Sequence, residues 1–170
     1  MKPILLSALI ATFFLGAAPS FALEVGDAAP CVELQDIQPD NAVISHCIRT
    51  KNDNNSFVLL EFFSTTCSDC AENLPKLSAL SQEIAGTTTT RLVGIDRDAQ
   101  AVPGYVAAHR DLIHFPAAID SDRMALRAYG VDSTPTTFIL NSSNQVIYKN
   151  VEVFTDSEIA KIKSLVQKNN

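Results

Sequence analysis

Two cysteines with two residues between them, Cys67 and Cys70, are the side chains of this sequence best suited to chemistry. A disulfide between them closes a very small ring, which constrains the unfolded chain little and therefore stabilises a fold poorly. Such a ring is well suited to being opened and closed, because one thiolate attacks a disulfide and the second thiol resolves the mixed disulfide. The spacing indicates thiol–disulfide exchange, and an inert structural disulfide is the alternative interpretation.

The elements around the two cysteines indicate which thiol attacks. Residues 57–63 form an apolar run with a single acid, Glu61, which is typical of a central strand buried on both faces. A helical pattern follows the cysteines and continues to about Ile84. The start of a helix favours an anion and lowers the pKa of a thiol placed there. We therefore expect Cys67, just before the helix, to be the nucleophile and Cys70, one turn into it, to be the resolving thiol.

Two further residues are candidates for catalysis. Burial would raise the pKa of the Glu61 carboxyl, and a carboxyl with a raised pKa could exchange a proton with Cys70. A solvated edge strand is the alternative explanation for an acid at this position. A cis peptide bond between Thr134 and Pro135 would expose backbone for pairing with an extended substrate, whereas a trans proline in a plain turn is the alternative.

The remaining cysteines, Cys31 and Cys47, are separated by 15 residues and suit a structural role. Closing a loop of that length stabilises a fold by roughly 3 kcal/mol in the chain-entropy model. We expect this disulfide to pin a short β-hairpin within residues 32–48, and a secondary redox relay is the alternative. A zinc site is disfavoured because the chain has no second Cys-x-x-Cys. The three histidines also lack metal-ligand spacing, and we expect neither a metal site nor a cofactor.

The first 22 residues have the pattern of a secretory signal peptide. Lys2 supplies the positive start, residues 4–15 the apolar segment, and residues 19–22 an exit of small residues. We expect cleavage after Ala22, export to the periplasm, and a mature chain of residues 23–170 that forms one domain. No later segment approaches the roughly 18 apolar residues of a membrane span, so we expect no stable membrane insertion after processing.

The acidic composition excludes several classes of partner. Lys and Arg number 13 and Asp and Glu 19, which gives a net charge of −6, or −7 once Lys2 is removed. Because the chain has no cluster of basic residues, this charge argues against nucleic acids and anionic membrane surfaces as partners. The composition is also unlike that of disordered chains, collagens and coiled coils.

The rest of the chain predicts strands and helices in alternation. We expect a strand at residues 91–96, a helix at 102–110, an extended segment at 115–119, a helix at 123–129, a hairpin of residues 136–140 and 145–149, and a last helix with Thr155 and Glu158 as its capping box. This order predicts an α/β fold in which a mixed central sheet is flanked by helices. A Cys-x-x-Cys at a strand-to-helix junction of such a fold favours a thioredoxin-like architecture.

Several segments resemble a known family. Residues 57–63 and 67–75 resemble the active-site strand and helix of thioredoxin, and residues 131–138 resemble the loop that carries its cis-proline. The opening at residues 26–30 and the extra helix and strand between residues 96 and 121 are similar to those of TlpA/ResA-like exported thioredoxins. Members of this family reduce disulfides outside the cytoplasm, often on apocytochrome c. The resemblance implies a thioredoxin-like fold with an N-terminal β-hairpin extension and a central helix-strand insertion.

The active-site segment also departs from the family pattern. Thr66 stands where the family usually has a tryptophan, and the dipeptide Ser68-Asp69 is neither Gly-Pro nor Glu-Pro. Glu61 and Asn73 stand in the reverse order of the amide and acid found in many ResA-like proteins. By the resemblance, the residues expected to contact a substrate are Thr66, Ser68, Asp69 and Thr134.

Together these observations predict a periplasmic thiol–disulfide oxidoreductase that reduces protein disulfides. Asp69 and Glu61 place negative charge near Cys67, and no basic residue lies between positions 61 and 73 to oppose it. A destabilised thiolate favours a reductant over an oxidant. The resemblance implies an upstream membrane electron donor of the DsbD/CcdA type. The alternatives are a DsbA-like disulfide oxidant, a peroxiredoxin-like peroxidase, and a copper chaperone or non-catalytic binding module on the same fold.

Overall fold

A mixed sheet forms the centre of the computed structural model, which describes residues 22–37, 43–44, 56–98 and 100–167. Within these ranges seven strands have the order β2-β1-β5-β4-β3-β6-β7. The strands are β1 (Leu34–Asp36), β2 (Val43–Ile44), β3 (Phe57–Phe63), β4 (Thr88–Gly94), β5 (Ala117–Ile119), β6 (Thr136–Leu140) and β7 (Val146–Asn150). The helices are α1 (Ser68–Glu83), α2 (Ala101–Ala108), α3 (Met124–Ala128) and α4 (Asp156–Gln167). The expected α/β fold with a mixed sheet flanked by helices is confirmed.

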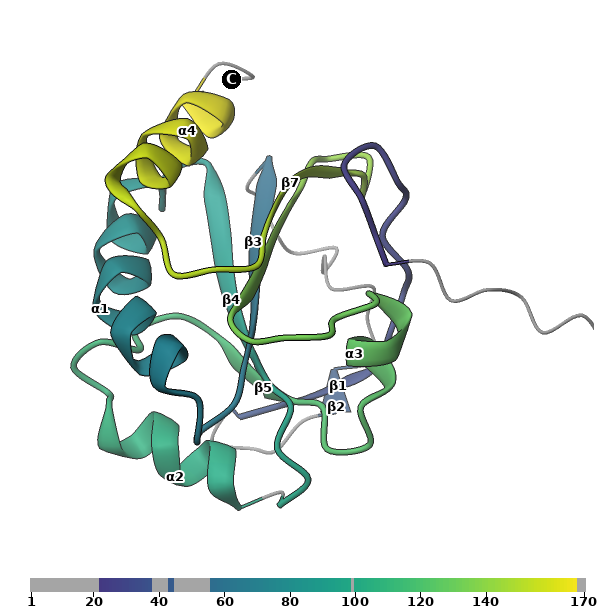
Figure 1. The fold of residues 1–170 in the computed structure, drawn as a ribbon, viewed down its shortest axis with the longest axis vertical. Helices are drawn as coiled ribbons and strands as arrows, with labels where there is room; N and C mark the ends of the chain where they lie inside the picture. The colour runs from purple at the N-terminus through teal and green to yellow at the C-terminus, as the bar shows by residue number, and fades with distance from the viewer. Residues whose placement is uncertain (1–21, 38–42, 45–55, 99, 168–170) are drawn as a thin grey trace, which may run out of the picture.

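Helices cover both faces of the sheet (Figure 1). α1 and α4 lie side by side on one face, where Leu77 and Ile162 belong to one apolar cluster. α3 lies on the other face, where Ala125 and the neighbouring Tyr129 belong to a second cluster. Since side chains alternate along a strand, β3 supplies both clusters, with Leu59 in the first and the adjacent residues in the second. The apolar sequence of β3 is therefore explained by burial on both faces.

The position of β3 in the sheet settles the environment of Glu61. β3 pairs in parallel with β4 on one side and antiparallel with β6 on the other, and all seven of its residues are buried. The edge-strand alternative for Glu61 is therefore wrong. By the two-residue period, Glu61 shares the α1-facing side of β3 with Leu59 and Phe63.

The strand after α1 begins earlier than we expected. We expected residues 91–96, whereas β4 spans Thr88–Gly94 and pairs with β3 from Phe57↔Thr88 to Phe63↔Gly94. The three threonines at residues 88–90, which lie between the expected helix and the expected strand, form the first half of this strand. Threonine is β-branched and suits a pleated, half-buried surface, and Thr88 and Thr90 are both buried.

Smaller differences concern the ends of the later elements. α2 ends at Ala108, and only Ala117–Ile119 of the expected extended segment pairs as a strand. α3 begins at Met124 because Arg123 has a left-handed backbone with φ of 59°. At the start of α4, the Glu158 N–H donates to the Thr155 hydroxyl at 3.2 Å as in a capping box. The Glu158 carboxylate instead accepts from the Tyr148 hydroxyl, so only the Thr155 half of the box is seen.

The N-terminal hairpin and the central insertion pair with each other at one side of the sheet. β1 and β2 pair antiparallel as the expected hairpin, and β1 also pairs with β5 of the central insertion, which in turn lies parallel to β4. Cys31 is disulfide-bonded, and its expected partner, Cys47, lies outside the described residues, as do residues 1–21. None of the helices in the described ranges is long and apolar enough to cross a membrane.

Gly94 sets how closely α2 approaches the sheet. It is buried at the end of β4, and a methyl group added there would collide with both γ-carbons of Val102 in the first turn of α2. Val102 is itself fully buried. The absence of a side chain at Gly94 therefore lets α2 pack on the sheet near the start of α1.

We predict that Gly94→Ala lowers the free energy of unfolding by about 1–3 kcal/mol, the usual cost of overpacking a core. Gly104→Ala is the matched control, because a methyl at this position in α2 has no neighbour within 4 Å and alanine favours a helix by up to about 1 kcal/mol. Urea denaturation measures both. Adding Val102→Ala to Gly94→Ala should recover part of the loss, and no recovery would contradict the packing argument.

Candidate active site

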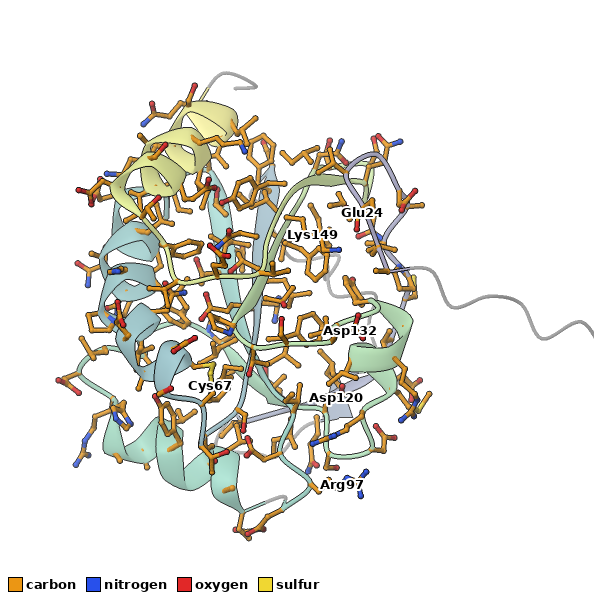
Figure 2. The ribbon with its side chains drawn as sticks, in the orientation of Figure 1. Glu24, Cys67, Arg97, Asp120, Asp132 and Lys149 are labelled. Carbon is orange, nitrogen blue, oxygen red and sulfur yellow. A yellow bond between two sulfur atoms is a disulfide. The ribbon has the colours of Figure 1, made fainter. Side chains whose placement is uncertain are left out.

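Cys67 and Cys70 form a disulfide where the chain leaves β3 and enters α1. Figure 2 shows Cys67 at this junction. Cys67 is the N-cap residue of α1, with extended backbone and a half-buried side chain, whereas Cys70 is 3% exposed. The Cys70 N–H donates to the Cys67 sulfur at 3.0 Å. In the reduced protein this N–H and the helix dipole favour a thiolate on the more accessible Cys67.

The loop before β6 lies directly against Cys67. The peptide bond between Thr134 and Pro135 is cis, as we expected. The carbonyl oxygen of Thr134 is 3.3 Å from the Cys67 sulfur. Beside this loop is a cavity of about 270 Å³ whose lining includes Arg123, Asp132 and Thr134. Thr134 thus borders both the cavity and the Cys67 sulfur.

The four residues expected to contact a substrate all border Cys67. Thr66, Ser68 and Asp69 are exposed neighbours of Cys67 in the sequence, and Thr134 is half-buried across from it. The Ser68 hydroxyl donates to the Asp69 carboxylate at 3.3 Å. Thr134, which is distant in sequence, thus lies close to Cys67 and its three exposed sequence neighbours.

Glu61 is a buried carboxyl beneath the first turns of α1. It is 1% exposed, and it accepts hydrogen bonds from the Asn73 amide at 2.9 Å and the Thr137 hydroxyl at 3.2 Å. Burial raises the pKa of Glu61 from 4.5 to about 8, although the two hydrogen bonds act in the opposite direction. At neutral pH Glu61 is therefore mostly protonated, next to the helical turn that carries Cys70.

Asn73 fixes the orientation of this carboxyl. Its side-chain oxygen accepts the Phe154 N–H at 2.8 Å, so its NH₂ group must face Glu61. Glu61 and Asn73, the acid and the amide that stand in reverse order relative to the family pattern, are thus direct hydrogen-bond partners. Both donors to Glu61 bind the same oxygen, Oε2, which leaves Oε1 to carry the proton.

α2 covers the outer side of this region. Tyr105 packs on Phe63 with ring centroids 5.4 Å apart and stacks on His109 at 4.1 Å. Burial, and secondly the charge of Glu61, raise the pKa of Tyr105. His114 lies elsewhere, with its Nε2 at 3.1 Å from the Ser81 hydroxyl, and His46 is outside the described residues. No group of three or more potential metal ligands occurs among the residues that the structure describes.

Sequence reasoning missed Asp96. This half-buried carboxylate follows β4 and accepts three hydrogen bonds from Ser64 and Thr65, the first two residues after β3. An acid at the carboxyl end of an apolar run was the available signal. The expected strand at residues 91–96 included Asp96, and a strand residue is not expected to contact the turn after β3.

Comparison with known proteins agrees with the geometry. The Redoxin family model matches residues 24–166. The chain is 26% identical over 111 residues to thiol-disulfide oxidoreductase ResA of Bacillus subtilis (strain 168), which covers 65% of this chain and 61% of that protein. The resemblance to TlpA/ResA-like thioredoxins is confirmed.

Solved structures show the same fold. The thioredoxin domain of a thiol-disulfide oxidoreductase from Bacteroides vulgatus superimposes with a TM-score of 0.70 and 18% identity, covering 85% of this chain and 99% of that one. StoA from Bacillus subtilis gives a TM-score of 0.60 with 18% identity, covering 80% and 97%. The chain therefore belongs to the Redoxin family, and it has the thioredoxin-like fold and the paired cysteines of a thiol–disulfide oxidoreductase.

Proposed function

We propose that this protein is a thiol–disulfide oxidoreductase that reduces the disulfides of exported proteins. The observation that carries the proposal is the arrangement of the Cys67–Cys70 disulfide, whose accessible sulfur lies at the start of α1 and whose buried sulfur lies one turn inside. The cis-proline loop with Thr134 borders the accessible sulfur. This geometry suits attack on a bulky disulfide by Cys67 and closure of the ring by Cys70.

The reaction proceeds in two exchanges. The Cys67 thiolate attacks one sulfur of the substrate disulfide, forming a mixed disulfide and releasing the first substrate thiol, which takes up a proton. Cys70 then loses its proton and attacks the Cys67 sulfur, which releases the second substrate thiol and closes the Cys67–Cys70 disulfide. Two electrons pass from the protein to the substrate, so an external reductant must open the ring again.

Glu61 is positioned to carry the proton of Cys70. With a pKa of about 8, close to the ordinary value of about 8.5 for a thiol, its carboxyl exchanges a proton with Cys70 at little energetic cost. Ionised Glu61 accepts the proton when Cys70 attacks. Protonated Glu61 returns it when a donor opens the disulfide and Cys70 leaves.

The proposal includes a location and a donor. Residues 1–22 would be removed as a signal peptide, leaving residues 23–170 as a thioredoxin-like domain in the periplasm. A membrane protein of the DsbD/CcdA type would supply electrons, and apocytochrome c or oxidised exported proteins would be the substrates. Cys31 and Cys47 would form the structural disulfide of the N-terminal hairpin, which agrees with the bonded state of Cys31.

We predict that the mature protein accelerates the reduction of insulin by dithiothreitol, measured as turbidity of the released chains. Cys67→Ser should abolish the acceleration because it removes the attacking sulfur. Cys70→Ser should instead trap substrates as mixed disulfides, which non-reducing electrophoresis detects. An inactive protein that, when reduced, binds stoichiometric copper against a chelator would favour the copper chaperone alternative.

We predict that Glu61→Gln slows turnover by about 10-fold or more, since a positioned acid–base group typically contributes a factor of about 10² to 10⁴. The wild-type rate should rise as the pH passes about 8, where Glu61 becomes a base, and the variant should lack this inflection. Insulin reduction across pH 6–9 measures both. An unchanged rate and profile would reduce Glu61 to a structural residue.

The same variant has a stability readout that serves as a control. The unfolded chain loses the Glu61 proton near pH 4.5, whereas the folded protein keeps it to about pH 8. The wild type should therefore lose up to about 1.4 kcal/mol per pH unit relative to Glu61→Gln as the pH rises through this window. Urea denaturation at pH 5 and pH 8 measures this difference independently of activity.

We predict a reduction potential nearer that of thioredoxin, about −270 mV, than that of DsbA, about −120 mV. The Thr134 carbonyl oxygen and the Asp69 carboxylate oppose a thiolate on Cys67, and a destabilised thiolate favours the reductant. Glu61 adds its charge only above about pH 8. Titration of Cys67–Cys70 against glutathione decides the direction. A midpoint on the oxidising side of about −180 mV, the value of disulfide isomerase, would favour a DsbA-like oxidant.

A further inference from the structure

We propose that Asp96 is a positioning residue for the nucleophile. It holds the turn between β3 and α1 so that the Cys67 sulfur keeps its hydrogen bond from the Cys70 N–H. The inference rests on the proposed function in one respect, the role of Cys67 as the attacking sulfur. The ends of the neighbouring strands bring the two segments together, since Phe63 pairs with Gly94 and the Ile95 N–H donates to the Phe63 carbonyl at 3.0 Å.

Within the part of the chain that the structure describes, the carboxylate of Asp96 accepts hydrogen bonds from the first two residues of the turn. Its Oδ1 accepts from the hydroxyls of Ser64 and Thr65, each at 3.0 Å, and its Oδ2 accepts from the Thr65 N–H at 3.0 Å. Hydrogen bonds to an ionised acceptor are the strong ones. No ion pair to Asp96 is seen among residues 22–37, 56–98 and 100–167, so this carboxylate is committed to the turn.

Ser64 links Asp96 to Thr66 and Cys67 through hydrogen bonds. Its single hydroxyl proton goes to Asp96, so the Ser64 oxygen must accept from Thr66, whose hydroxyl lies at 3.2 Å and whose N–H lies at 3.4 Å. The Ser64 carbonyl accepts the Cys67 N–H at 3.1 Å. The turn from Ser64 to Cys67 is thus closed at one end by the cysteine and anchored at the other by Asp96.

The anchored turn determines how the sulfur meets the helix. As the N-cap of α1, Cys67 needs a non-helical backbone, here φ of −84° and ψ of 115°, to present its sulfur to the Cys70 N–H. Thr66 is exposed, and Ser64 and Thr65 are half-buried, so apolar packing contributes little to the conformation of the turn. Hydrogen bonds to Asp96 therefore keep the N-cap geometry that stabilises the thiolate.

Electrostatics alone predicts the opposite change in the reactivity of Cys67, which makes the inference testable. A carboxylate near Cys67 disfavours the thiolate, so neutralising Asp96 should by charge alone lower the thiol pKa and speed alkylation. If Asp96 positions the turn, neutralising it should slow alkylation instead. The other ionisable groups around the turn are the same in all variants: Glu61, Asp69, Arg97, Tyr105, His109 and Asp132.

The experiment measures alkylation of Cys67 by iodoacetamide from pH 4 to pH 10 in the full mature chain carrying Cys70→Ala, which keeps the residue-70 N–H. Asp96→Asn should slow the reaction at pH 7 at least 3-fold and raise the apparent pKa of Cys67. Asn loses the charge, and if its oxygen accepts the Thr65 N–H, its NH₂ group faces the Ser64 and Thr65 hydroxyls, which can then no longer donate to residue 96. Asp98→Asn is the matched control, because Asp98 accepts from the Gln100 N–H and not from the turn, and this variant should be no slower than the parent.

Ser64→Ala keeps the carboxylate and breaks the link to Thr66, so it should slow alkylation about 2-fold. It also carries the test if Asp96→Asn does not fold, as judged by circular dichroism. Alkylation equal to or faster than that of the parent in either folded variant would overturn the inference, even if the melting temperature falls. Because the assay needs no protein substrate, failure here is distinct from failure of insulin reduction, which tests the proposed function.

Discussion

The central position of β3 is the constraint on which the rest of the site depends. Because β3 and β4 run parallel, both end at the same edge of the sheet, and antiparallel β6 begins there with Thr136 paired to Phe62. The start of α1, the Asp96 carboxylate and the cis-proline loop therefore meet at one place. Ligands of α/β sheets generally bind beyond the carboxyl ends of the strands, and the accessible sulfur of this protein lies at such an edge.

The same central position imposes a desolvation cost on Glu61. A carboxyl in the middle of a strand buried on both faces loses its hydration, and so Glu61 keeps its proton at neutral pH. Asn73 from α1 and Thr137 from β6 satisfy one oxygen, so that the group remains hydrogen-bonded inside the core. Local rules of core composition are broken here, as is usual at functional sites. The carboxyl that we propose as the proton carrier thus bonds to α1, the helix that holds the buried Cys70.

Two opposing contacts act on the accessible sulfur. The Cys70 N–H and the start of α1 favour a thiolate, whereas the Thr134 carbonyl oxygen at 3.3 Å opposes it. The first contact comes from α1 and the second from the loop before β6. Both depend on where the turn after β3 places Cys67. The reactivity of the dithiol is thus a property of how three segments are held against one another, in addition to the identity of the two cysteines.

The sequence by itself determined the features that depend on neighbours along the chain. The spacing of Cys67 and Cys70, the apolar run of β3 and the helical period after it required the strand, the helix and the dithiol at their junction, because such patterns are read within a few residues. Only the tertiary structure decided which distant groups meet there. Cys67 contacts Thr134 across 67 positions, Ser64 contacts Asp96 across 32, and Asn73 contacts Phe154 across 81. These partners depend on strand order and register, which no local pattern specifies. For the same reason the extent of β4 was misread, since its polar threonines become strand residues only through pairing with β3.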